Sequence, residues 1–252
     1  MRVTRSERRG GLPRERHADS EGSSRSQRRL LSSVLVSPVR FDLPRLAALL
    51  AAHPRIDVPA LPGRRNHLQA GVLVPLRFVD DDLEVVLTER AATLRHHGGE
   101  ISFPGGKPDP NDPDLEHTAL REAEEEIGLR DAWVLGRLSS IPLYTSDFRL
   151  EPFVAVVPRD AVLVPSPHEV ARVVMLSVRE VLARSHLVGI PWTHEGREHL
   201  SPVFEVEGGK LVYGGTAHAL HELLTIVARA AERELPPLRR GDVDWRDVLP
   251  RS

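Results

Sequence analysis

The sequence predicts an α/β protein in which helices cover both faces of a mixed β-sheet. Short runs rich in Val and Leu, such as Gln69–Phe78, predict buried strands. Segments with helical boundary residues are interspersed among these runs, without the regular strand–helix alternation of a parallel sheet. Forty per cent hydrophobic residues in a chain of 252 supply a sizeable core. We therefore expect an α/β/α sandwich.

The N-terminal residues 1–30 predict a disordered tail. They hold nine Arg, four acidic residues and almost no large apolar side chains. Such a segment buries too little surface to offset the entropy of ordering. A basic tail can also contact nucleic acid, and that alternative stays open. Residues 31–67 follow as a helix, Leu43–Ala52, which Pro54 stops, and a Pro-rich connector.

The main domain is expected at residues 68–234, with a C-terminal tail at residues 235–252. Its first strand, a turn and a return strand form a hairpin. Gly and Pro predict a loop over residues 89–112. Helices are then predicted at Pro113–Ile127, Val178–Ala183 and Thr216–Glu234, and strands at Trp133–Tyr144, Glu151–Val157, Ala171–Leu176, Leu187–Trp192, Val203–Val206 and Leu211–Tyr213.

The composition excludes several classes of partner and chemistry. The formal net charge is −2, which implies no nucleic-acid or membrane partner for the molecule as a whole. Cysteine is absent, which rules out disulfides, thiolate metal sites and a cysteine nucleophile. No apolar run approaches the roughly 18 to 20 residues that span a bilayer, and we find no secretory signal. We expect a cytoplasmic protein that acts on a small molecule; the sequence makes no prediction about oligomeric state.

The helix predicted at Pro113–Ile127 has well-marked boundaries. Asp112 is a good N-cap, and Pro113 stands at the first helical position, where its missing N–H costs nothing. Gly128 stands where a left-handed residue ends a helix. The local sequence therefore predicts both ends of this helix.

Three carboxylates gather on one side of the same helix. At about 100° per residue, Glu122, Glu125 and Glu126 fall within an arc of roughly 100°. Like charges near a helix C-terminus repel one another and oppose the helix dipole. A Mg²⁺ or Mn²⁺ ion bound to their oxygens resolves this conflict, and Arg121 can orient a carboxylate. A solvated acidic face is the alternative. The adjacent arc is apolar and can bury against a sheet: Ala119, Leu120, Ala123 and Ile127.

The sequence around these carboxylates resembles the Nudix box. The core of that box reads Arg-Glu-hydrophobic-x-Glu-Glu-x-Gly-hydrophobic, and every specified position matches from Arg121 to Leu129. The general box places Gly, five residues, Glu and seven residues before its Arg. Here Gly106, five residues, Asp112 and eight residues precede Arg121, so the first acid is Asp and the loop is one residue longer.

A second segment resembles the coenzyme A diphosphatase branch of the Nudix superfamily. That branch carries Leu-Leu-Thr-x-Arg-(Ser/Ala)-x3-Arg-x3-Gly-x3-Phe-Pro-Gly-Gly just before its box. The matching positions run from Val86 to Gly106, and only Val86 differs, conservatively. Residues 212–217 are similar to a further segment of the branch, with Tyr213 in place of Trp. The resemblance covers about residues 68–230.

The resemblance implies a metal-dependent hydrolase that cleaves the diphosphate bond of coenzyme A or its derivatives. The expected products are 3′,5′-ADP and 4′-phosphopantetheine or its acyl form. Glu122, Glu125 and Glu126 are the expected catalytic residues and ligands of Mg²⁺ or Mn²⁺, and Arg121 positions them. Water is expected to attack phosphorus. The general base stays open among three acids: Glu122, Asp147 and Glu169.

Candidate substrate contacts lie in the upstream segment. Arg90 and Arg95 can give bidentate hydrogen bonds to phosphate groups. Gly105 and Gly106 let backbone amides approach an anion. For the two Arg, surface solubility or pairing with a nearby Glu is the alternative. The remaining polar or aromatic residues of note are expected to be structural or solvated: Phe103 in the core, His96 and His97 in a solvated loop, and His218 and His221 in the last helix.

Three other functions remain as alternatives. One is a Nudix diphosphatase for another nucleoside diphosphate derivative, such as ADP-ribose. Another is a non-catalytic, nucleotide-binding Nudix-like module, which we would expect to lack a carboxylate of the box; this chain retains them all. The last is a nucleic-acid-binding protein led by residues 1–30, which the weak charge of the domain disfavours.

Overall fold

The computed structural model describes residues 39–194 and 196–249. The disordered tail expected at residues 1–30 lies outside this part of the chain. Every helix in the described ranges falls short of the combined length and apolarity needed to cross a lipid bilayer.

Helix α1 (Leu43–Ala52) has the predicted bounds. The Asp42 side chain caps it by accepting a hydrogen bond from the backbone N–H of Arg45 at 3.0 Å. Leu46 and Leu50 are buried, four residues apart, and therefore lie on one face of the helix. The helix thus contributes one apolar stripe to the core.

Eight strands in the described residues form one mixed sheet, with the central order β3-β2-β1-β7-β5. Strands β1 and β7 run parallel in continuous register from Leu68–Phe148 to Arg77–Val157, and the other pairings are antiparallel. The mixed sheet predicted from the sequence is confirmed. Its strands are β1 (Leu68–Val79), β2 (Asp82–Arg90), β3 (Ile101–Ser102), β4 (Gly105–Gly106), β5 (Trp133–Arg137), β6 (Ile141–Pro142), β7 (Phe148–Val157) and β8 (Val170–Ser177).

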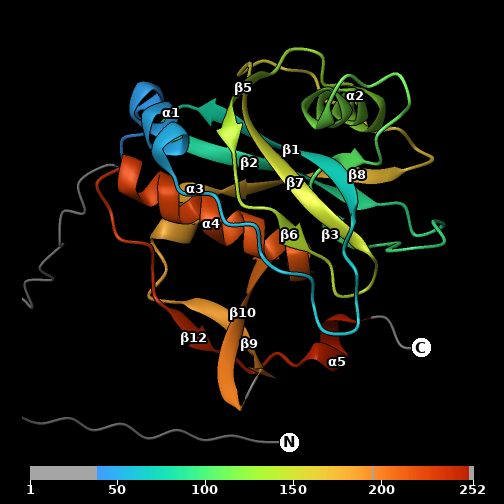
Figure 1. Ribbon diagram of the computed structural model, residues 1–252. Helices are drawn as coiled ribbons and strands as arrows, with labels where there is room; N and C mark the ends of the chain where they lie inside the picture. Colours follow the sequence, from blue (N-terminus) through green and yellow to red (C-terminus); the bar gives the residue numbers. More distant parts are fainter. Residues whose placement is uncertain (1–38, 195, 250–252) are drawn as a thin grey trace, which may run out of the picture. The chain divides into compact units, whose positions relative to one another are not determined.

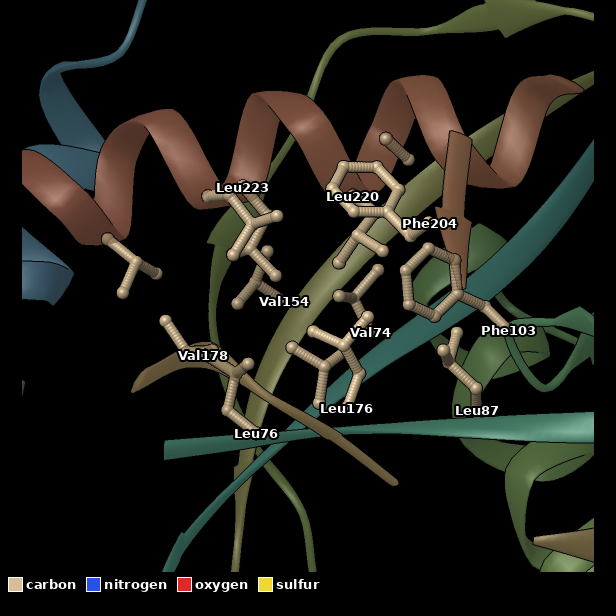
Figure 2. Packing of buried hydrophobic residues seen from close by; sticks show 14 of the residues in the cluster. Val74, Leu76, Leu87, Phe103, Val154, Leu176, Val178, Phe204, Leu220 and Leu223 are labelled. Carbon is tan, nitrogen blue, oxygen red and sulfur yellow. The ribbon is translucent and has the colours of Figure 1, made fainter. Parts of the chain in front are cut away.

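Helices cover both faces of this sheet, α2 one face and α1 with α4 the other (Figure 1). The alternation of β1 explains the two cores. Val72 and Val74 point toward α1 and α4, whereas Leu73 points toward α2. Figure 2 shows Leu220 and Leu223 of α4 above Val74. The α/β/α sandwich is confirmed, with helices α2 (Leu115–Ile127), α3 (Val178–Leu182) and α4 (Gly214–Ala230).

The C-terminal part of the described chain forms a smaller sheet in the order β11-β10-β9-β12. Residues 235–252 were expected as a tail, but β12 within them pairs in parallel with β9. A three-residue strand is too short to give a periodic pattern, so the sequence could not mark it. The elements are β9 (Leu187–His194), β10 (Arg197–Val206), β11 (Lys210–Val212), β12 (Leu238–Arg240) and the short helix α5 (Trp245–Val248).

Two further expectations are wrong in detail. The strand predicted at Trp133–Tyr144 is broken into β5 and β6, and a register shift between Val134 and Gly136 marks irregular pairing with β7. The loop predicted at residues 89–112 contains the two-residue strands β3 and β4. Gly and Pro are frequent in this segment, but β2 and β1 still supply hydrogen-bond partners for the backbone of β3 and β4.

Candidate active site

Helix α2 begins two residues later than the sequence predicted. Its N-cap is Asp114, which accepts the backbone N–H of His117 at 2.9 Å, so the prediction of Asp112 as the cap is wrong. The Asp112 carboxylate instead accepts hydrogen bonds from residues further along the chain, including the Thr118 hydroxyl at 2.9 Å and the Arg121 guanidinium. The predicted C-terminal end of α2 is confirmed, because Gly128 caps the helix in the left-handed conformation, with a φ of 68°.

The apolar stripe of α2 lies directly on the sheet. Ala119, Ala123 and Ile127 are fully buried against residues of β1, β2 and β7. A Cβ added at Gly71 of β1 would lie 2.4 Å from the backbone oxygen of Leu115. Only glycine therefore allows this approach of helix and strand, which sets the height of the carboxylates above the sheet.

Gly105 and Gly106 lie beneath two of the predicted carboxylates. A Cβ at Gly106 would lie 2.5 Å from the carboxyl carbon of Glu122. The backbone N–H of Gly105 donates to Oε2 of Glu126 at 3.3 Å. Gly105 has a φ of 155°, and a Cβ there would meet backbone of β1. The absence of side chains at both positions thus makes room for the carboxylates.

Arg121 joins the loop before α2 to the carboxylate face. Its guanidinium lies 3.0 Å from Oδ2 of Asp112, 3.0 Å from Oε1 of Glu122 and 2.9 Å from Oε2 of Glu125. It also donates to the backbone oxygen of Lys107 at 3.1 Å. The pairing with carboxylates expected for this Arg is therefore present, and one cation holds three acids.

The carboxylates of Glu122 and Glu126 lie in a poorly solvated part of the site. Burial raises the pKa of Glu126 to about 7; the Arg90 guanidinium, 3.6 Å away, opposes the rise, and Glu122 and Glu169 add to it. Burial also raises the pKa of Glu122, against the effect of Arg121. Only 3% of Glu126 is exposed. Water therefore contributes little to the stabilisation of this charge.

This donor set fits a hard divalent cation, because buried carboxylate oxygens with raised pKa values gain from a nearby positive charge. Glu122 and Glu126 both adjoin the glycine pair, whereas Glu125 is half exposed and turned toward Arg121. Among the described residues, no three His, Asp or Glu side chains are already drawn close enough to hold an ion. The role of all three Glu as ligands stays a prediction.

The part of the chain that carries this site is similar to known proteins. The NUDIX domain profile matches residues 67–195. The Nudix hydrolase NudL of Photorhabdus laumondii subsp. laumondii, described as uncharacterized, is 34% identical over 174 residues, covering 67% of this chain and 91% of the relative. The chain belongs to the Nudix hydrolase family. A NudL of Yersinia pestis is 35% identical over 158 residues, covering 62% of this chain and 77% of that protein. A MutT/nudix family protein from Enterococcus faecalis has a TM-score of 0.47 at 15% identity, covering 77% of this chain and 73% of that one.

The two candidate substrate Arg of the Nudix domain differ in setting. Arg90 ends β2 and lies beside Glu126, and its buried Nε has no hydrogen-bond partner among the described residues. Arg95 is exposed in the loop that follows, and within the described chain it makes no hydrogen bond or ion pair. The first is thus built into the carboxylate site, and the second is accessible to a ligand.

Nearby residues of the Nudix domain have structural contacts. Phe103 is buried in the core, as expected, among the residues drawn in Figure 2. His97 is an exposed loop residue, as expected, and its Nδ1 lies 3.0 Å from Oε2 of Glu100. His218 is a structural helix residue, as expected, hydrogen-bonded to the Ser201 hydroxyl at 3.0 Å.

The structure distinguishes between Asp147 and Glu169 as possible general bases. Asp147 accepts the backbone N–H of Arg65 at 2.9 Å and so fixes a loop. Glu169 is exposed and close enough to raise the pKa values of Glu122 and Glu126. Sequence reasoning missed Asp112 as the partner of Arg121, although an acid shortly before the helix was the available signal.

Proposed function

We propose that this Nudix hydrolase cleaves the diphosphate bond of coenzyme A or its derivatives in a reaction that depends on Mg²⁺ or Mn²⁺. The products are 3′,5′-ADP and 4′-phosphopantetheine or its acyl form. The observation that supports the proposal is the 3.6 Å approach of Arg90 to Glu126. One residue belongs to the segment that resembles the coenzyme A branch, and the other belongs to the Nudix box.

The acidic residues hold the metal in this proposal. Glu122, Glu125 and Glu126 supply its oxygen ligands, and Arg121 orients two of them through contacts of 2.9 and 3.0 Å. A bound divalent ion neutralises charge on the phosphoryl oxygens. Glu169 is the favoured general base, because its exposed carboxylate lies beside the cluster while Asp147 is committed to a loop.

The basic residues bind the anionic substrate. Arg95 is exposed and carries a planar guanidinium that suits a phosphate group. Arg90 lies closer to the carboxylates and balances their charge until the metal and the diphosphate enter. Gly105 and Gly106 stay candidate substrate contacts, because they carry no side chains of their own and their backbone lies against the Glu122 and Glu126 carboxylates, where the diphosphate would meet the metal.

A metal-dependent substrate screen tests the proposal. The purified full chain is incubated with coenzyme A, an acyl-coenzyme A, ADP-ribose or a dinucleoside polyphosphate, with Mg²⁺, Mn²⁺ or EDTA. Chromatography should show 3′,5′-ADP only from the coenzyme A compounds and only with metal. Turnover of ADP-ribose or the polyphosphate alone would replace the substrate and keep the reaction class. Absence of any turnover would favour the non-catalytic module.

A further inference from the structure

The last two residues of β2 point to opposite faces of the main sheet. Val86 packs toward α2 and Leu87 toward α4, and Arg90 lies on the side of Val86 and Glu89 on the side of Leu87, although the pairing with β8 shifts register between Glu89 and Arg90. Arg90 accordingly meets Glu126 of α2. Any contact that fixes Glu89 therefore also fixes the backbone that carries Arg90.

Glu89 is held by two cations on that other face. Its carboxylate accepts from Nε of Arg172 at 2.7 Å and lies 3.3 Å from Nζ of Lys210. Burial alone would raise the pKa of Glu89, but Arg172 and Lys210 outweigh it and hold the pKa below its ordinary value. The Glu89 side chain is 15% exposed, so these ion pairs are partly shielded from water.

Lys210 also reaches the loop that carries Arg95. Its Nζ lies 3.5 Å from the backbone oxygen of Gly99, and the Gly99 N–H donates to the backbone oxygen of Arg90 at 3.0 Å. The backbone N–H of Arg90 donates in turn to the backbone oxygen of Glu100 at 2.9 Å. One ammonium thus ties together both ends of the loop 91–98.

The hairpin that supplies Lys210 comes from the smaller sheet. Lys210 begins β11, which pairs with β10, and lies beyond the residues matched by the NUDIX domain profile, 67–195. Arg172 of β8 strengthens the junction by donating to the backbone oxygen of Glu207 at 2.8 Å. The contact therefore joins two sheets at the base of the Arg-bearing loop.

We propose that Lys210 is a positioning residue, which holds Glu89 and Gly99 and thereby sets the placement of Arg90 and Arg95 for the substrate. The link to substrate affinity rests on the proposed function of these two Arg. The link to loop placement does not, because it follows from the contacts of Lys210 alone. The smaller sheet is then a functional part of the Nudix hydrolase.

The test compares Lys210→Met, which keeps the stem and removes the charge, with Lys210→Arg, which restores it. Arg240→Met is the matched control, because Arg240 of β12 forms an ion pair with Glu198 in the same sheet, away from the loop. Lys210→Met should speed amide hydrogen exchange of residues 91–100 by about two- to fivefold, the range expected for a partly exposed ion pair. The KM should rise by a similar factor with kcat within about twofold.

Lys210→Arg should recover both readouts, and Arg240→Met should leave both at the wild-type values. Unchanged exchange in Lys210→Met, or the same change in Arg240→Met, would overturn the proposal. A fall in kcat at constant KM would also overturn it, since the two Arg would then not act through binding. If wild-type protein does not turn over coenzyme A, the proposed function fails, while the exchange measurement still decides the role of Lys210.

Discussion

At the scale of single residues, the candidate site depends on where carboxylates are buried. Glu126 is almost fully covered and Glu122 partly so, whereas Glu124 of the same helix is exposed and pairs with Arg130 at 3.0 Å. The sequence predicted which Glu share a helix face, because helical spacing fixes those positions, and their role as metal ligands stays a prediction. The sequence could not predict the shift in pKa, which arises from the surrounding sheet and loop.

Glu126→Gln should abolish most turnover and keep the fold. The amide can still accept from Gly105, but it removes the negative charge that a metal ion needs, so kcat should fall by about two orders of magnitude or more. The thermal midpoint should stay unchanged or rise, because the substitution removes a carboxylate whose charged form is disfavoured by burial. Kinetics and calorimetry on both variants check this, with Glu124→Gln as the control; comparable activity in the two would exclude Glu126 from the reaction.

At the scale of elements, long patterned segments were predictable and short ones were not. Helix α1 and strand β1 carry enough periodic residues to be recognised. The strands β3 and β12 have two and three residues and exist because a neighbour offers an edge. The start of α2 shows a further limit: Asp112 and Asp114 are both acceptable caps locally, and the distant Arg121 decides between them.

Two glycines that face each other in register, Gly71 and Gly106, should respond in opposite ways to Ala. Gly71→Ala drives a methyl group into the backbone of α2 and should cost about 1–3 kcal/mol of stability. The methyl group of Gly106→Ala first meets the end of the Glu122 side chain, which can move, so activity should fall while the thermal midpoint changes little. Melting curves and rates measured on both variants check the contrast, and equal melting losses would contradict it.

At the scale of the whole described unit, one core joins the two sheets. Phe204 of the smaller sheet packs with Leu220 of α4 and with residues of the main sheet (Figure 2), and Val212 belongs to the same buried cluster. His218 adds a polar link from α4 to Ser201 of β10. The sequence predicted α4 and most of these strands but not their junction, because residues such as Gly99 and Lys210 lie far apart along the chain.

His218 should make the stability of the protein sensitive to acid. Burial lowers its pKa in the folded state, with a smaller effect from His221, so the neutral form is favoured there. An unfolded His protonates first as the pH falls through about 6.5, so this contribution to stability is present above that pH and is lost below it. Thermal midpoints between pH 8 and 5 should therefore fall less for His218→Gln than for wild type; parallel curves would refute this.

Because lysine is scarce in this sequence, the contact of Lys210 with the loop can be probed by chemical labelling. Lys107 and Lys210 are the only lysines in the sequence, and every other basic side chain except His is Arg. Lys107 follows the glycine pair and lies 5.1 Å from the ring centre of Phe148, while Lys210 supports the Arg-bearing loop. Reagents that acylate side-chain amines should therefore label, among the described residues, only Lys107 beside the glycine pair and Lys210 beside the Arg-bearing loop, so these two labels can report on the candidate site without any engineered residue.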